Sequence, residues 1–168
     1  WIRLWLEAIA SWEIEVGMEM TTEMSVALRY QSHLAPLIAC VVSSEGPILE
    51  IGVGHFSTPQ LHALCNALDR MLISVEPDAT WREEFSRFAS GKHHVRADYN
   101  AFQMPGFAWN FGVVFIDHSP GGENRAKAFR DFIDIAQYIV VHDYEQDNEE
   151  AIAPLLKDVY HVVCRDYL

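Results

Sequence analysis

The residues best suited to chemistry are two short pairs that each join an acid to a histidine. Asp117 and His118 directly follow one apolar run, and His142 and Asp143 directly follow another. An imidazole exchanges a proton near neutral pH, and a carboxylate beside it can orient the ring. Adjacent residues of a strand point to opposite faces, so we expect Asp117 to serve His142 across two strands. The pairs predict a base, His118 or His142, that removes a proton from a hydroxyl group.

Two other interpretations of these residues remain open. In the first, Asp117 and Asp143 bind a divalent metal together with a histidine or Glu145. An oxygen-rich site of this kind suits magnesium or manganese, and an added histidine suits zinc or iron. In the second, the same groups only form hydrogen bonds within loops. We favour proton transfer over the structural role, and the structural role over a metal site, so we predict no metal.

A glycine turn predicts a ligand site elsewhere in the chain. Gly52 and Gly54 lie between an apolar run and a helical stretch, where such glycines allow a sharp turn and close ligand approach. Glu76 ends the next apolar run, and a carboxylate there can accept both hydroxyls of a ribose. Ser57 replaces the third glycine of the dinucleotide fingerprint, which argues against a cofactor bound through a pyrophosphate. We therefore predict a ribose-bearing ligand, with a nicotinamide cofactor disfavoured.

These segments resemble class I S-adenosylmethionine-dependent methyltransferases. The run Glu50-Ile51-Gly52-Val53-Gly54 is similar to the first motif of that family, and Val75-Glu76-Pro77-Asp78 is similar to the second. The pair Ser57-Thr58 resembles a subgroup in which Ser-Thr follows the glycine turn. The resemblance implies that S-adenosylmethionine is the cofactor, bound by Glu50, Gly52, Gly54, Ser57, Glu76 and Asp98. In this assignment Glu50 faces the methionine ammonium group, Glu76 binds the ribose hydroxyls and Asp98 reads the adenine amino group.

The acid–histidine segments also resemble a poorly characterised subgroup of methyltransferase-like proteins. Its members carry an Ile-Asp-His-Ser-Pro-Gly run, here 116–121, and a Val-His-Asp-x-Glu run, here 141–145, and Arg125 falls near the subgroup's basic position. The Asn-Pro-Pro-Tyr motif of enzymes that methylate exocyclic amines of nucleobases is absent. The resemblance implies methyl transfer to a hydroxyl of a small-molecule or glycan-type acceptor, with Asp117, His118, His142 and Asp143 on the acceptor side. The alternative is a methyltransferase fold that binds a ligand or partner without turnover.

Short apolar runs alternate with helical stretches, which predicts an α/β fold with a doubly wound, mainly parallel sheet. We expect strands at 48–51, 72–75, 93–97, 112–116, 138–141 and 160–164, and helices at 58–71, 80–89, 124–135 and 149–156. The aromatic segment 99–110 either covers a ligand or packs on the core. Residues 1–45 are expected to form N-terminal helices that pack on a core of 46–168, within one structural domain.

The N-terminal helices carry their own predictions. Six apolar residues share one helical face, Trp1, Leu4, Trp5, Ala8, Ile9 and Trp12. That face is expected to pack on the domain, with a homodimer contact or a lid as the alternatives. A second helix is predicted over 23–35, with Pro36 breaking or kinking it before a further helical stretch to 43.

The composition limits the partners of the chain. With 24 acidic and 12 basic side chains among 168 residues, the net charge is −12, which argues against generic binding to phosphate backbones. The longest clean apolar run, 34–42, is too short to cross a membrane. The three cysteines, Cys40, Cys65 and Cys164, are odd in number and widely spaced, which favours reduced thiols and a cytoplasmic location.

Overall fold

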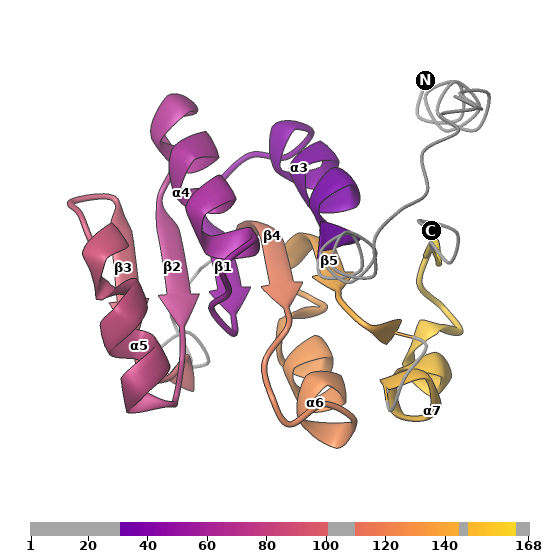
Figure 1. The fold of residues 1–168 in the computed structure, drawn as a ribbon. Coiled ribbons are helices and arrows are strands. Elements are labelled where there is room, and N and C mark those ends of the chain that lie inside the picture. Colours follow the sequence, from indigo (N-terminus) through magenta and orange to yellow (C-terminus); the bar gives the residue numbers. More distant parts are fainter. Residues whose placement is uncertain (1–30, 101–109, 145–147, 164–168) are drawn as a thin grey trace, which may run out of the picture.

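The computed structural model describes residues 31–100, 110–144 and 148–163, and five parallel strands form one sheet in it. Their bounds are β1 (Ile48–Ile51), β2 (Leu72–Val75), β3 (His93–Arg96), β4 (Phe111–Ile116) and β5 (Ala136–Val141). The strands lie in the order β3-β2-β1-β4-β5, and all arrowheads point to the same edge (Figure 1). The predicted doubly wound α/β class is confirmed.

Helices precede, connect and follow these strands in the described residues. They are α3 (Leu34–Val42), α4 (Ser57–Ala67), α5 (Ala79–Phe85), α6 (Glu123–Phe132) and α7 (Glu149–Ile152), with short 3₁₀ segments at Ser86–Phe88 and Ala153–Leu156. None of the helices in the described ranges is both long enough and apolar enough to span a bilayer. The predicted helices at 80–89 and 149–156 are present, each as an α-helical part followed by a 3₁₀ turn.

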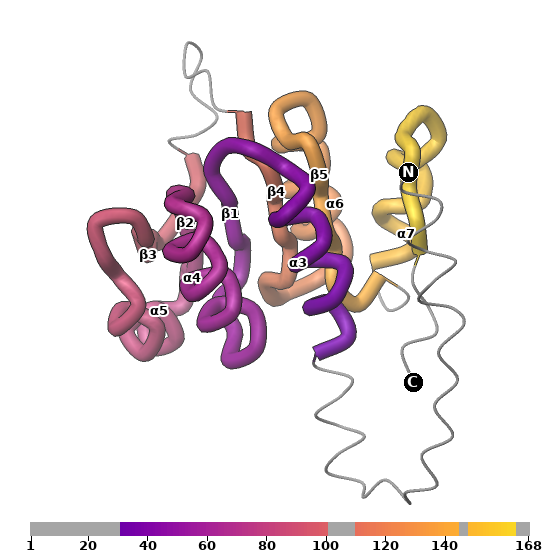
Figure 2. Tube along the Cα trace, turned by 90° about the horizontal axis from the view of Figure 1, so that it is seen from above, coloured from indigo at the N-terminus to yellow at the C-terminus, as the bar shows by residue number. Residues whose placement is uncertain are grey.

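Two apolar layers cover the two faces of the sheet. Leu49 of β1 packs in a buried cluster with Phe132 of α6 on one face. Ile48 points to the opposite face, where it packs with Leu37 of α3 and Leu61 of α4. Figure 2 shows α3 and α4 on the same side of the sheet. The central strands β1, β2 and β4 are buried at every position, which explains why they are almost continuously apolar rather than alternating.

The strand order creates a crevice at the carboxyl edge of the sheet. From β1 the chain continues to β2 and β3 on one side, and it then crosses over to β4 and β5 on the other. The segments that follow β1 and β4 therefore diverge, and ligands of such sheets bind at this switch point. The fold thus places the glycine turn after β1 next to Asp117 after β4.

Pro36 is not a helix terminator, contrary to the prediction. The first helical bond of this segment runs from the Leu37 N–H to the His33 carbonyl, at 3.0 Å, so Pro36 lies in the first turn of α3. Proline is tolerated there because the first N–H groups of a helix have no intrahelical partner. The predicted helices over 1–12 and most of 23–35 lie outside the described residues.

The predicted strand over 160–164 is wrong in its described part. Residues 160–163 are not in a strand, and the side chains of Tyr160 and Val162 are 88% and 55% exposed. Strand propensity reflects how a residue fits a half-buried, paired surface, and these residues find no such surface. The predicted helix over 58–71 also ends early, at Ala67, and Asp69 beyond it adopts a left-handed φ of 57°.

Candidate functional site

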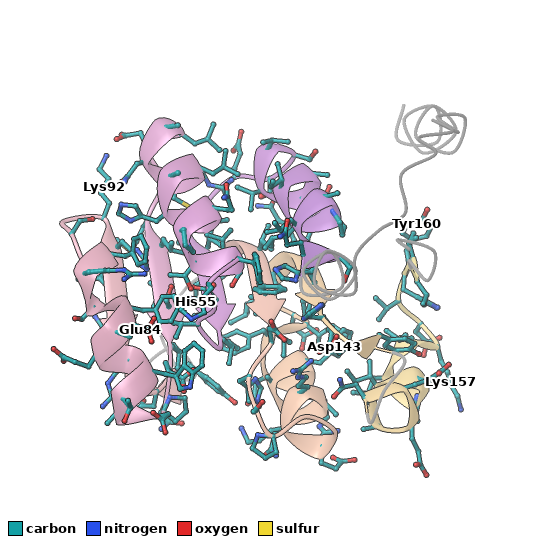
Figure 3. The ribbon with its side chains drawn as sticks, viewed as in Figure 1. His55, Glu84, Lys92, Asp143, Lys157 and Tyr160 are labelled. Carbon is teal, nitrogen blue, oxygen red and sulfur yellow. The ribbon has the colours of Figure 1, made fainter. Side chains whose placement is uncertain are left out.

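A cavity of about 420 Å³ opens at the switch point of the sheet. Its wall combines the turn after β1 with the ends of β4 and β5, and with side chains from α5, α6 and the start of α3. The lining residues are His33, Gly54, His55, Phe56, Ser57, Trp81, Asp117, Ser119, Arg125, His142 and Asp143. Figure 3 labels two of them, His55 from the turn after β1 and Asp143 from the end of β5. The volume is that of a small-molecule site.

Gly52 brings the end of β1 against the end of β4. Its φ is +95°, and a Cβ there would lie 2.6 Å from the His118 nitrogen and 2.7 Å from the Asp117 carbonyl oxygen. Both neighbours are main-chain atoms that cannot move independently of β4. Glycine is therefore required at this position by the backbone conformation and by the close approach of the two strands.

Gly54, in contrast, has no such structural requirement. Its φ lies outside the left-handed region, and a Cβ there would meet only the Ser57 hydroxyl, at 3.4 Å. Gly54 lines the cavity, so the missing side chain leaves its main chain open on that side. A ligand in the cavity could approach the backbone here more closely than at any residue with a Cβ.

Glu50 lies behind this turn and is fully buried. Its carboxylate accepts hydrogen bonds from Thr58 Oγ1 at 2.9 Å and from Ser74 Oγ at 2.5 Å. Thr58 Oγ1 in turn accepts the Gly54 N–H at 3.0 Å. Glu50 is not a lining residue, so its link to the cavity runs through Thr58 and Gly54. The contact with a ligand ammonium group that the resemblance implies stays a prediction.

Burial dominates the electrostatics of Glu50. Loss of hydration raises its pKa to about 7, although hydrogen bonds from Ser74, Ser57 and Thr58 act in the opposite direction. A carboxyl with this pKa is largely protonated in weak acid and ionises only near neutral pH.

Glu76 lies beside the glycine turn, as expected for acids at the ends of adjacent parallel strands. Its carboxylate accepts the Val53 N–H at 3.4 Å and the Asp78 N–H at 2.8 Å. Asp98 follows β3 and accepts the N–H of Asn100 at 3.0 Å. Neither acid is among the residues that line the cavity in the described structure. Most of the predicted aromatic loop, residues 101–109, lies outside the described residues.

His142 pairs with Asp117 across β4 and β5, which confirms the predicted cross-strand contact. His142 Nδ1 lies 3.1 Å from Asp117 Oδ1. An ionised carboxylate can only accept, so Nδ1 carries the proton and a neutral ring keeps its lone pair on Nε2. Nε2 lies 3.3 Å from Ser32 Oγ and 3.4 Å from Asp143 Oδ1.

Arg125 of α6 holds the ends of β4 and β5 together. Its guanidinium donates to the main-chain carbonyls of His118, at 2.9 Å, and of His142, at 2.6 Å. It also donates to Asp117 Oδ1 at 3.1 Å. The side chain is only 7% exposed, so these are buried charge-assisted bonds that fix the Asp117–His142 geometry.

The environment of His142 favours its protonated form. Burial alone would lower the pKa of His142, and Arg125 acts in the same direction. The hydrogen bond to Asp117 and the negative charges of Asp117 and Asp143 outweigh both, so the pKa of His142 is raised above 6.5. His142 is thus a stronger base than a free imidazole.

We expect the ring signals of His142 in an NMR titration to follow a pKa above 6.5. Exchange of Asp117→Asn removes the charge and should bring that pKa below 6.5, because burial and Arg125 then dominate. A wild-type pKa below 6.5 for His142 would contradict this account.

His118, the other candidate base, does not line the cavity in the described structure. Its ring nitrogen Nδ1 is buried without a hydrogen-bond partner within the described residues. Burial lowers its pKa, and the charge of Arg125 lowers it further. Of the two predicted histidines, His142 is therefore the one placed to meet a ligand.

Two lining residues had no motif to mark them in the sequence. His33 precedes α3, is 6% exposed, and lies with its ring centroid 4.9 Å from that of Phe115 and 4.4 Å from that of His142. Trp81 of α5 stacks on Phe85 at 5.7 Å and lies 5.4 Å from the ring of His55. The indole and the His55 imidazole form an aromatic wall close to Gly54.

Comparison of the chain with models of protein families finds no match, and comparison with curated proteins finds none either. The resemblance to class I methyltransferases therefore stays a prediction based on the motifs.

Proposed function

We propose that this protein is an S-adenosylmethionine-dependent methyltransferase that methylates a hydroxyl group of a small-molecule or glycan-type acceptor. The observation that supports this most is the composition of the cavity at the switch point. One side carries the bare main chain of Gly54, with Glu76 close by at the end of β2. The other side carries His142 held by Asp117.

The cofactor side suits an adenosyl ligand without a phosphate. Glu76 offers carboxylate oxygens that accept ribose hydroxyls, and Trp81 and His55 offer flat surfaces for a planar ring. Ser57, in place of a third glycine, is 2% exposed at the start of α4. S-adenosylmethionine has no pyrophosphate to place against that helix start, which favours it over a nicotinamide cofactor.

The reaction would be an in-line displacement at the methyl carbon. The acceptor oxygen forms a bond to that carbon, the carbon–sulfur bond breaks, and its electron pair stays on the sulfur of S-adenosylhomocysteine. The hydroxyl proton passes to His142 Nε2, while Asp117 holds the ring in the required tautomer. The protein contributes mainly by positioning the two substrates.

The second candidate is a binding module that holds the ligand without turnover. The contacts of His142 Nε2 with Ser32 and Asp143 favour it, because Nε2 is the atom that would take the proton in the reaction. A small-molecule acceptor stays an implication of the resemblance, and a cytoplasmic location stays a prediction from the cysteines. A homodimer through residues 1–12 stays an alternative to simple packing.

The cofactor assignment is tested by two substitutions in calorimetric titrations with S-adenosylmethionine and S-adenosylhomocysteine. We expect Glu76→Ala to weaken binding roughly 10- to 100-fold, since hydrogen bonds to a charged group contribute about 1.5–3 kcal/mol. Gly54→Ala should weaken binding while leaving the melting temperature unchanged, because its Cβ meets only Ser57. The controls are Glu83→Ala, on the exposed side of α5, and Gly91→Ala. If both ligands bind Glu76→Ala and Gly54→Ala as tightly as the wild type, the assignment is wrong.

A further inference from the structure

We propose that His33, Asp117 and His142 form a binding site for a divalent transition-metal ion. One ligand atom from each side chain lies within 4.8 Å of the other two. Ligands around one zinc ion, each about 2.1 Å from it, are roughly 3–3.5 Å apart. Closure around an ion therefore needs side-chain shifts of about 1 Å, with no change in the strands. The site goes beyond the proposed function, because it does not depend on an adenosyl ligand.

His33 supplies the strongest argument for a ligand at this point. The side chain is 94% buried, it lines the cavity, and neither ring nitrogen has a hydrogen-bond partner within the described ranges. Buried polar atoms are almost always hydrogen-bonded, so two unsatisfied nitrogens in one ring need an explanation. Burial, followed by the nearby His142, lowers the pKa of His33 to about 4, so the ring is neutral and keeps a lone pair for a metal.

Asp117 and His142 complete the set with donors of the right kind. Asp117 Oδ1 and His142 Nδ1 lie 3.1 Å apart, which is close to the separation of two ligands on one ion, so an ion would take the place of the proton between them. Arg125 and Asp143, the other charged groups at the site, have opposite charges. With Asp117, and with His142 in the neutral form that binds an ion, the local charge is therefore −1, which favours a cation.

The donor set selects the type of ion. Two imidazoles and one carboxylate suit zinc, iron(II) or cobalt(II), whereas magnesium prefers a set made only of oxygens. Three protein ligands leave a fourth position open toward the cavity. An ion on His142 Nδ1 leaves the ring proton on Nε2, the atom that the proposed proton transfer needs, so the ion and the transferred proton exclude each other.

Cobalt(II) provides a direct test, because its visible absorption reports the ligands and its binding can be measured without S-adenosylmethionine. We expect the full chain to bind one cobalt ion with absorption typical of nitrogen and oxygen ligands, and zinc to displace it. His33→Phe keeps a ring against Phe115 but removes one ligand, and it should weaken cobalt binding at least 10-fold. The control, His161→Ala, removes an exposed histidine outside the site and should bind cobalt as the wild type does.

The proposal is overturned if folded wild-type protein binds no cobalt, or if His33→Phe binds it as tightly as the wild type. If His33→Phe does not fold, NMR of the wild type decides: one equivalent of zinc must shift the ring signals of His33 and His142, and unshifted signals reject the site. Cobalt binding is measured without an adenosyl ligand, and adenosyl binding by the wild type is measured in buffer with a metal chelator. Failure of the metal site therefore leaves the methyltransferase proposal intact, and failure of adenosyl binding leaves the metal site intact.

Discussion

Replacing Gly52 with alanine is expected to destabilise the protein by roughly 2–5 kcal/mol. A side chain at φ +95° carries a backbone penalty, and the new Cβ would overlap main-chain atoms of Asp117 and His118 at 2.6–2.7 Å. The end of β4 would have to move away from β1 to make room. Urea denaturation followed by circular dichroism measures the loss.

Gly91→Ala is the matched control, because a Cβ at that position meets no atom within 4 Å. We expect its free energy of unfolding to stay within about 0.5 kcal/mol of the wild type. Equal stability of Gly52→Ala and Gly91→Ala would mean that the close approach of β1 to β4 is not as described. Because the ends of β1 and β4 form part of the cavity wall, the described shape of the cavity would then be wrong too.

Replacing Glu50 with glutamine is expected to stabilise the protein at pH 8 by up to about 3 kcal/mol, and to change its stability little near pH 4. The folded-state pKa of Glu50, about 7, is above its usual value of 4.5. The stabilisation of the folded protein by the Glu50 carboxyl is therefore fully present below pH 4.5. It is lost as the pH rises through 7, because the carboxyl ionises at a lower pH in the unfolded chain than in the folded protein. The magnitude follows from about 1.4 kcal/mol for each pKa unit.

The hydrogen bonds of Glu50 can be kept by glutamine. The amide NH₂ can donate to Ser74 Oγ, which then donates to His93 Nε2, 2.9 Å away. Urea denaturation at a series of pH values measures the difference, with the exposed Glu45→Gln as the control for net charge. A glutamine variant no more stable than the wild type at pH 8 would contradict this account of Glu50.

The sheet could be predicted from the sequence because its strands are buried on both faces. The run 112–116 is apolar throughout and the run 72–75 is apolar except for Ser74, and the helical stretches in the chain leave a parallel sheet as the consistent solution. The prediction was wrong at 160–163, because local strand propensity finds no partner strand there within the described part of the chain. It also failed at Pro36, because a proline that breaks a helix and one in its first turn look alike in the sequence.

The site was predictable where neighbouring strand ends define it. The contact between Asp117 and His142 follows from two adjacent parallel strands and the alternation of side chains. His33 could not be predicted, because it precedes a helix that packs across the sheet, far from the strand-end motifs in the chain. The burial of Glu50 could not be predicted either, because it depends on Thr58 and Ser74, which enclose its carboxylate.

Calorimetric titration of the wild-type protein with S-adenosylmethionine tests the central claim most directly, with NAD under the same conditions as the comparison. The account predicts one site per chain for S-adenosylmethionine, weakened in Glu76→Ala, and no measurable binding of NAD. The absence of adenosyl binding by folded protein, or tighter binding of NAD, would contradict it.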